Sequence, residues 1–234
     1  MHEQFWHERW EKRQIGFHEG KPNELLVKYL SALNLNYNER IFLPLCGKTV
    51  DIAWLLSQGY RIAGAELSEL AIQELFEDLK IKPQVTSLAQ LKHYSAPNLD
   101  IFVGNIFNLS TEQLGKVDAI YDRAALVALP PEMRTLYTEH LVKITNCAPQ
   151  LLIVFEYPQG SMQGPPFSIA QEEIEAHYEE IYAKGADCKF PNCTHTHEVN
   201  CAVKDAVEQE EISAMRYDSY VSLLEAVDEE HKRR

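Results

Sequence analysis

The chain has 234 residues, a formal net charge of −13 at pH 7, 45% apolar residues and five cysteines. The apolar fraction supports a globular core, and the length allows one large domain or one domain with a small module. The acidic balance argues against a general nucleic-acid binder, because phosphate contacts need clustered Lys and Arg. The N-terminal stretch lacks the apolar core of a secretory signal, and no apolar run approaches membrane-spanning length.

Two helices are predicted before the first strand. Trp6 and Trp10 are four residues apart, so both rings share one face of a first helix. Such a face either packs on the domain or forms a lid over a flat ligand. A second, amphipathic helix is predicted over residues 22–33, where apolar side chains recur at helical spacing: Leu25, Leu26, Tyr29 and Leu30.

A strand, a glycine turn and a helix follow, and they form the most informative stretch of the sequence. Residues 41–45 predict a buried strand, Cys46 and Gly47 the turn, and residues 50–59 the helix. Such corners bind nucleotide-like ligands, because glycine lets the backbone approach closely and the helix N-terminus faces the ligand. The corner is not a Walker loop, since Phe42 occupies the position of the required earlier glycine.

Glu66 ends the next predicted strand, residues 61–67, and lies nineteen residues after Gly47. An acidic side chain at that place can accept hydrogen bonds from both ribose hydroxyls of an adenosine. Ser68 is then expected to cap a helix over residues 69–79. These two strand ends together predict an adenosine site.

The remaining elements alternate up to about residue 184. Apolar runs predict further strands at residues 82–87, 99–103, 117–121 and 151–157, and helices over residues 130–145 and 169–182. This alternation implies an α/β fold with a parallel sheet and helices on both faces. Beyond residue 184 only helices are expected, over residues 202–211 and 213–227. We place the boundary between a domain of residues 1–183 and a tail of residues 184–234.

Six segments of the first domain share a pattern with one enzyme family. They are HERWEKRQIGFHEG (7–20), IFLPLCGKTVDIAWLLSQGY (41–60), GAELSELAIQELF (64–76), GNIFNLS (104–110), VDAIYDRAALVALPPEMR (117–134) and GPPFS (164–168). Over about residues 1–180 the chain resembles the bacterial form of the thiopurine S-methyltransferase family. The resemblance implies a Rossmann-like methyltransferase sheet, S-adenosyl-L-methionine as methyl donor, and a small aromatic or heterocyclic thiol as substrate.

The resemblance also implies which residues form the site. The cofactor contacts fall on Trp10, Leu45, Glu66, Asn105, Ile106 and Arg123. Asn105 and Ile106 match the positions that flank the adenine, and Phe17 matches an aromatic side chain that closes over cofactor and substrate.

Arg123 keeps three roles open: a pair with the methionine carboxylate, a contact with the acceptor, or an ion pair with Asp122. Asp122, in the same motif, is a further candidate for orienting the acceptor. No catalytic base is implied, because an aromatic thiol ionises near neutral pH and the protein then has only to align the reactants and exclude water.

The tail carries a cluster of metal-ligating side chains within fourteen residues: Cys188, Cys193, His195 and Cys201. Thiolates and an imidazole suit tetrahedral Zn²⁺, and a site filled entirely by protein ligands is structural. His197 is an alternative to His195. This uneven use of cysteine indicates reduced thiols, a metal site and a cytoplasmic location in preference to disulfides.

The tail has a resemblance of its own, carried by CKFPNCTHTHEVNCAVKDAVEQEEISAMRYDSYVSLLEA (188–226). Residues 187–227 resemble the C-terminal zinc module of the circularly permuted ribosome-assembly GTPases of bacteria, which implies contact with the small ribosomal subunit. No GTP-binding motif accompanies the module. Residues 184–234 hold seven basic and eleven acidic side chains, which disfavours RNA binding by the tail alone.

The two resemblances together indicate a composite chain. The alternative function is therefore an interaction protein whose zinc tail docks on the ribosome or another partner and whose methyltransferase body is inactive. The methyltransferase family normally adds two strands after the helix that matches residues 169–182. Since the tail replaces those strands, the strand over residues 151–157 is expected to be an unpaired apolar edge unless the tail or another chain covers it.

Overall fold

The computed structural model describes residues 3–158, 161–162, 164–170, 179–190, 193–214 and 217. The chain divides into two units, residues 1–155 with 159–167, and residues 156–158 with 168–234. The predicted domain boundary at residues 183–184 stays a prediction. The helices expected over residues 169–182 and 213–227 lie mostly outside the described residues.

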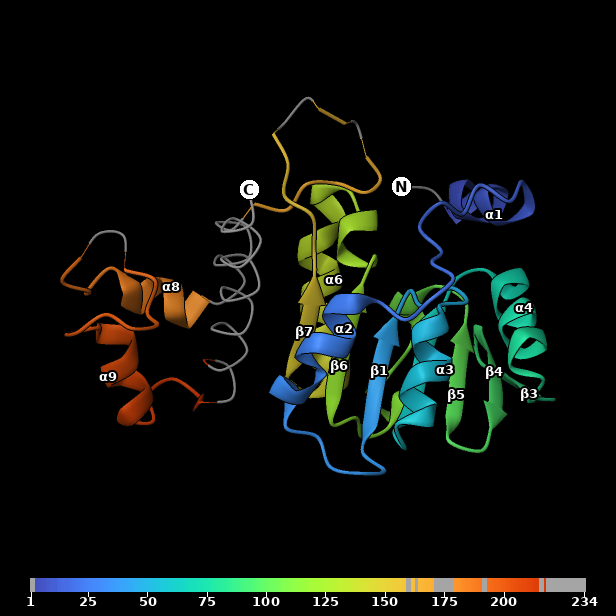
Figure 1. Cartoon of the computed structure of the whole chain (residues 1–234), viewed down its shortest axis with the longest axis horizontal. Helices are drawn as coiled ribbons and strands as arrows, with labels where there is room; N and C mark the ends of the chain where they lie inside the picture. The colour runs from blue at the N-terminus through green and yellow to red at the C-terminus, as the bar shows by residue number, and fades with distance from the viewer. Residues whose placement is uncertain are drawn as a thin grey trace. The chain divides into compact units, whose positions relative to one another are not determined.

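The first unit is built on a seven-stranded sheet with the order β3-β4-β5-β2-β1-β6-β7 (Figure 1). The strands are β1 (Arg40–Pro44), β2 (Arg61–Glu66), β3 (Gln84–Leu88), β4 (Leu91–Ala96), β5 (Leu99–Val103), β6 (Ala119–Arg123) and β7 (Gln150–Ile153). The five strands from β5 to β7 in that order run parallel, as predicted. The expectation of a wholly parallel sheet is wrong at the other edge, where β3 pairs antiparallel with β4, and β4 with β5.

The unpredicted strand, β4, explains that difference. A two-residue turn joins it to β3, and a connection this short can only join antiparallel strands. Ala89 in the turn adopts a positive φ of 54°. The turn contains neither glycine nor asparagine, so the usual sequence signal of a hairpin is missing.

β7 is the edge strand of the described part of the sheet, in agreement with the predicted unpaired edge. It ends at Ile153, earlier than the predicted residue 157. Ile153 is paired with Arg123, the last residue of β6, so the neighbouring strand offers no partner beyond this point.

Six helices and three 3-10 turns complete the described part of the first unit. They are α1 (Glu3–Glu11), α2 (Glu24–Tyr29), η1 (Leu30–Leu33), α3 (Val50–Ser57), α4 (Glu69–Leu79), η2 (Ile106–Asn108), α5 (Thr111–Leu114), η3 (Leu126–Ala128) and α6 (Pro131–Thr145). Ser68 caps α4 as predicted, because its side chain accepts a hydrogen bond from Ala71 N. The second helix begins later than predicted, because Asn23 caps it by accepting from Leu25 N and Leu26 N.

α3 and α6 cover opposite faces of the sheet. Tyr121 of β6 donates a hydrogen bond from Oη to Asp51 of α3, at 3.0 Å. The next residue, Asp122, accepts one from Oη of Tyr137 of α6, at 2.6 Å. Successive residues of a strand point to opposite faces, so the predicted helices on both faces are confirmed.

The core lies between the sheet and these helices. Its fully buried apolar side chains include several large ones from β1, β2, β5, α2, α3 and α4: Leu26, Ile41, Phe42, Ile52, Leu55, Ile62, Ile72 and Leu99. α1 lies over the carboxyl ends of the parallel strands (Figure 1). The core therefore holds the strand ends in place below, and α1 covers them from above.

The second unit contains α8 (Glu179–Gly185) and α9 (Ala202–Glu208), which contact each other. Among the described residues, its buried apolar cluster consists of Ile181, Cys201, Val203, Ala206 and Ile212. Small units with clusters of this kind are often held together by a disulfide or a metal.

The buried carboxyl group of Asp122 makes a prediction about stability. Burial raises the pKa of Asp122 to about 6, against the opposing hydrogen bonds from Tyr137 and the backbone of Leu126 and Ala125. A carboxyl group with a higher pKa in the folded state stabilises the fold below its unfolded pKa and loses that contribution as the pH rises through its folded pKa. Relative to Asp122→Asn, the unmodified chain should lose about 2–3 kcal/mol of unfolding free energy between about pH 4 and 7.

Urea unfolding of both proteins across this pH range measures the difference. Asp78→Asn serves as the control, because the side chain of Asp78 is 62% exposed. A difference between the unmodified chain and Asp122→Asn that does not change with pH would contradict the prediction.

Candidate active site

A cleft of about 480 Å³ opens at the carboxyl edge of the sheet. The residues predicted to contact cofactor or substrate all line it: Trp10, Phe17, Leu45, Glu66, Asn105, Ile106 and Arg123. They come from the N-terminal segment (residues 3–19), from the ends of β1, β2 and β6, and from the loop after β5. Ligands of open α/β sheets bind at this edge, and the volume is typical of small-molecule sites.

The corner after β1 forms the floor of the cleft. Leu45 and Gly47 adopt positive φ values of 47° and 51°, which turn the chain sharply before α3. A Cβ built on Gly47 would lie 3.0 Å from Cζ2 of Trp10. The corner therefore needs glycine for two reasons, its backbone conformation and the close approach of the Trp10 ring.

Glu66, at the end of β2, is 7% exposed and accepts hydrogen bonds from the backbone of two loops. Its Oε2 accepts from Gly47 N and its Oε1 from Ser68 N, both at 2.8 Å. Burial raises the pKa of Glu66, and these N–H groups oppose the rise. The two bonds orient the carboxylate, and each oxygen keeps a lone pair for a ligand hydroxyl.

The aromatic side chains of the N-terminal segment gather over the cleft. The Phe17 ring meets the rings of Trp6 and Trp10 edge-on, with centroid distances of 6.0 and 5.7 Å. Arg13 ties the segment to α4 through an ion pair with Glu74 at 2.6 Å. The predicted shared face of Trp6 and Trp10 is thus confirmed, and the rings both pack on the domain and line the cleft.

Asn105 begins the loop that follows β5, on the other side of Glu66. Its Oδ1 accepts from Phe107 N at 3.0 Å, which caps η2, and its Nδ2 donates to Glu3 of α1 at 2.8 Å. Ile106 is 9% exposed, and its carbonyl lies 2.8 Å from Nε2 of His140. This loop therefore has a defined conformation where the adenine is expected.

Arg123 pairs with Glu19, and not with Asp122 as one of the open alternatives had it. Nη2 of Arg123 forms the ion pair, and Nη1 donates to the carbonyl of Phe17 at 3.1 Å. Asp122 is 1% exposed and bonds Tyr137 on α6. The expectation that Asp122 orients an acceptor is therefore wrong, since its side chain points to the opposite face from Tyr121, which lines the cleft.

Sequence reasoning did not single out the apolar wall next to Arg123. It is formed by Val127, Ala128, Leu129, Met133, Phe155, Pro165 and Pro166. Most of these residues lie in the segments 117–134 and 164–168, which carried the family resemblance, so a signal was present. Their meeting in one wall depends on how the loops after β6 and β7 fold, which no local pattern describes.

The comparisons with known proteins assign the chain to a family. The family model described as thiopurine S-methyltransferase matches residues 1–213. The chain belongs to the thiopurine S-methyltransferase family. Similar proteins named thiopurine S-methyltransferase occur in Xanthobacter autotrophicus (54% identity over 187 residues, 80% of this chain and 88% of that protein) and Acinetobacter baylyi (50% over 186 residues, 78% and 86%).

Solved structures share the fold at low identity. A SAM-dependent methyltransferase from Anabaena variabilis gives a TM-score of 0.52 at 16% identity, over 76% of this chain and 80% of that chain. A magnesium protoporphyrin IX methyltransferase from Synechocystis, solved with SAH, gives 0.52 at 14% identity, over 76% and 88%. With the family membership, these findings make the chain a methyltransferase that depends on S-adenosyl-L-methionine, and they do not favour the interaction-protein alternative.

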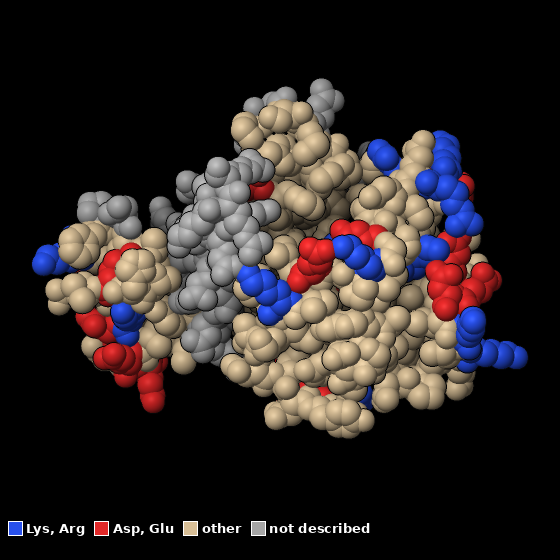
Figure 2. All heavy atoms as spheres, viewed as in Figure 1, with Lys and Arg blue, Asp and Glu red and all other residues tan. Residues whose placement is uncertain are grey.

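Charges of opposite sign lie next to one another on the face shown in Figure 2, above all over α1 and α4. Lys48, for example, lies 3.1 Å from both Glu74 and Asp78. Such pairs suit a small-molecule enzyme better than a protein that binds a phosphate backbone. Within the described residues, no helix is both long enough and apolar enough to cross a membrane. The predicted cytoplasmic location and ribosome contact stay predictions.

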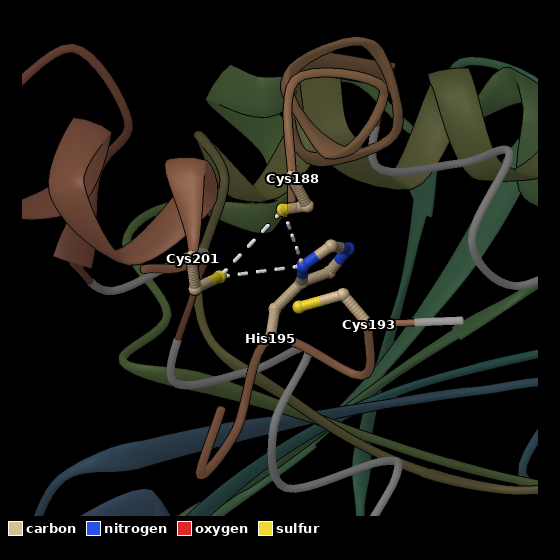
Figure 3. A group of neighbouring side chains, drawn as sticks. All are labelled: Cys188, Cys193, His195 and Cys201. Atoms are coloured by element: carbon tan, nitrogen blue, oxygen red, sulfur yellow. Dashed lines mark hydrogen bonds between the residues drawn. The ribbon is translucent and has the colours of Figure 1, made fainter. Parts of the chain in front are cut away.

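The second unit brings the four predicted metal ligands together (Figure 3). The Sγ atoms of Cys188 and Cys201 are 3.9 Å apart, and each lies 3.5 Å from Nδ1 of His195. The ligand atoms of these residues and Cys193 all lie within 4.8 Å of one another. With zinc bonds of about 2.3 Å to sulfur and about 2.0 Å to nitrogen, the edges of a tetrahedron are about 3.8 and about 3.6 Å. The arrangement therefore fits Zn²⁺.

The loop around His195 is held in one conformation. Glu198 accepts hydrogen bonds from Thr194 N at 2.8 Å and Thr196 N at 3.0 Å. Tyr217 donates to the carbonyl of His195 at 2.6 Å. His197 is exposed, and its Nδ1 contacts Thr196, so the imidazole in the cluster is that of His195 and not that of His197.

The contact between Gly47 and Trp10 makes a prediction about the corner. Gly47→Ala should lower the unfolding free energy by about 1–2 kcal/mol, because alanine disfavours positive φ and its Cβ displaces the Trp10 ring. Gly20→Ala is the matched control, because a Cβ on Gly20 meets nothing within 4 Å. Urea unfolding and tryptophan fluorescence measure both effects. Equal stability and unchanged emission in the two variants would contradict the assignment.

Proposed function

We propose that the chain transfers the methyl group of S-adenosyl-L-methionine to the sulfur of small aromatic or heterocyclic thiols, with thiopurines among them. The observation that carries the proposal is the division of the cleft into two halves. On the side of β2 and β5, Glu66 and Asn105 offer polar groups that suit an adenosine, and on the side of β6 and β7 the wall is apolar. An apolar wall suits a flat ring better than a sugar or a peptide.

Each predicted contact residue has a role in this proposal. Glu66 accepts hydrogen bonds from the ribose hydroxyls, Asn105 and Ile106 flank the adenine, and the backbone of Leu45 supports the cofactor from below. Trp10 covers the cofactor. Phe17 and Arg123 stand at the border between the two halves, where the acceptor would meet the methyl group.

The chemistry needs little from the side chains beyond positioning. The sulfonium of S-adenosyl-L-methionine makes its methyl group electrophilic. The thiolate sulfur of the acceptor bonds to that methyl carbon in line with the departing sulfur, which keeps the electron pair of the broken bond. The proton of the thiol is lost to water beforehand. The residues of the cleft hold the two reactants in line and keep water out.

Glu66→Gln tests the proposal. The unmodified chain should bind S-adenosyl-L-methionine and form one S-methyl product for each S-adenosylhomocysteine with 4-mercaptobenzamide or a thiopurine. The variant should bind the cofactor about 1–3 kcal/mol more weakly, because an amide loses the charged hydrogen bonds to the ribose and keeps an acceptor oxygen for only one of the two backbone N–H groups. Calorimetry measures binding, and chromatography measures the products.

Glu69→Gln is the control, because Glu69 lies three residues away but bonds Lys92 and Tyr94 outside the cleft. Equal cofactor affinity in both variants would remove Glu66 from the site. Cofactor binding without methyl transfer to either thiol would refute the proposed acceptor class.

We also propose that Cys188, Cys193, His195 and Cys201 hold a structural Zn²⁺. A site with four protein ligands leaves no position for a substrate, so the ion would link the two short helices and their small apolar cluster. The division into a domain of residues 1–183 and a tail of residues 184–234 is proposed from the change in sequence pattern, and α8 extends across this boundary.

Metal analysis tests the zinc proposal. Protein purified without chelators should contain about one Zn²⁺ per chain, and Cys188→Ser should lose most of it, because a thiolate ligand is replaced by a hydroxyl. Cys147→Ser is the control, since Cys147 is exposed and lies outside the cluster. Equal zinc content in the two variants, or no zinc in the unmodified chain, would contradict the assignment.

A further inference from the structure

Arg123 lies at the end of β6, and the carboxylate of Glu19 compensates its charge. Its Nη2 forms an ion pair with Glu19, and its Nη1 donates to the carbonyl of Phe17 at 3.1 Å. The side chain of Arg123 is 12% exposed and that of Glu19 is 44% exposed. The ion pair therefore borders the cleft, with the arginine covered and the carboxylate facing water.

Other charged side chains that line the described cleft also have partners. Lys48 pairs with Glu74 and Asp78, and Asp51 accepts from Asn23 N and from Tyr121. The guanidinium of Arg9 lies over the Phe5 ring, on α1. Arg123 is the cation on the strand that borders the apolar wall, next to Ala124 and Val127. The charge that an acceptor meets in this half of the cleft therefore depends on Arg123 and Glu19.

We propose that Glu19 sets the charge selectivity for the acceptor, as a positioning residue that acts through Arg123. While Glu19 holds the guanidinium, the cleft takes thiols with an uncharged ring and discriminates against thiols that carry a carboxylate. This inference rests on the proposed function, because it concerns the acceptor of the same reaction.

The physical reason is competition for one guanidinium. A carboxylate on the acceptor would form strong, charge-assisted hydrogen bonds with Arg123, but only in the place that Glu19 occupies. The two carboxylates would otherwise lie within a few ångströms of each other, where like charges repel even near water. Replacing Glu19 by glutamine removes the repulsion and leaves the guanidinium available to the ligand.

A matched pair of acceptors tests the inference. 4-Mercaptobenzoate and 4-mercaptobenzamide have nearly the same size and differ in charge. The ratio of kcat/KM for the benzoate to that for the benzamide should rise on the order of tenfold in Glu19→Gln, through a lower KM for the benzoate. If the role of Glu19 were purely structural, its replacement would change kcat/KM for both acceptors by the same factor and leave the ratio unchanged.

Three further variants locate the effect. Glu19→Asp keeps the charge and should keep the original ratio. In Glu19→Gln combined with Arg123→Gln the gain should disappear, because the cation is gone. Glu24→Gln should not move the ratio, because Glu24 pairs with Lys21 and does not line the cleft. A gain that survives the loss of Arg123 would overturn the proposal.

A binding measurement separates this inference from the proposed reaction. Calorimetry with benzoate and benzamide, in the presence of S-adenosylhomocysteine, needs no turnover. Tighter binding of benzoate, but not of benzamide, to Glu19→Gln would support the role of Glu19 in charge selectivity even if neither thiol were methylated. Turnover of 4-mercaptobenzamide with equal benzoate affinity in both proteins would support the proposed function and overturn the role of Glu19.

Discussion

The site depends on one buried carboxylate. Glu66 accepts from Gly47 N and Ser68 N, both at 2.8 Å, and so joins the corner after β1 to the start of α4. Without it, two backbone N–H groups next to the cleft would lack an acceptor, which is costly in a buried place. The same bonds aim the carboxylate at the cleft. One side chain thus holds the strand ends together and presents the group that suits a ribose.

The N-terminal segment turns this open edge into an enclosed site. Trp10 lies against Gly47, the Phe17 ring meets the rings of Trp6 and Trp10 edge-on, and the ion pairs of Arg13 and Arg123 tie the segment to α4 and β6. A methyl transfer between a sulfonium and a thiolate needs alignment and exclusion of water more than it needs an acid or a base. In the proposed reaction, aromatic rings held by ion pairs at their margins would provide both. The ion pair between Arg123 and Glu19 also neutralises the charge of the guanidinium beside the apolar wall, where the acceptor is proposed to bind.

The second unit is stabilised differently from the first, according to the proposed zinc site. In its described part, α8 and α9 bury few apolar side chains, and the four side chains of Cys188, Cys193, His195 and Cys201 lie at distances that fit a tetrahedral ion. The family model extends to residue 213 and therefore into this unit, whereas two of the similar bacterial proteins align over only 187 and 186 residues. The family model therefore includes the four ligands in its range, while the metal-binding geometry is supported separately by the distances between their side chains.

The sequence by itself determined the buried parallel strands, the cap at Ser68, the glycine corner, the acidic end of β2 and the three cysteines of the proposed metal site. These features depend on short-range patterns of hydrophobicity, turn chemistry and ligand spacing, which are written locally in the chain. Only the tertiary structure decided that β4 inserts antiparallel, that Arg123 pairs with Glu19, that Asp122 faces α6, and that His195 enters the metal cluster instead of His197. Each of these features depends on contacts between residues that are far apart in the sequence. Such contacts follow from the packing of whole elements and loops, which no local pattern describes.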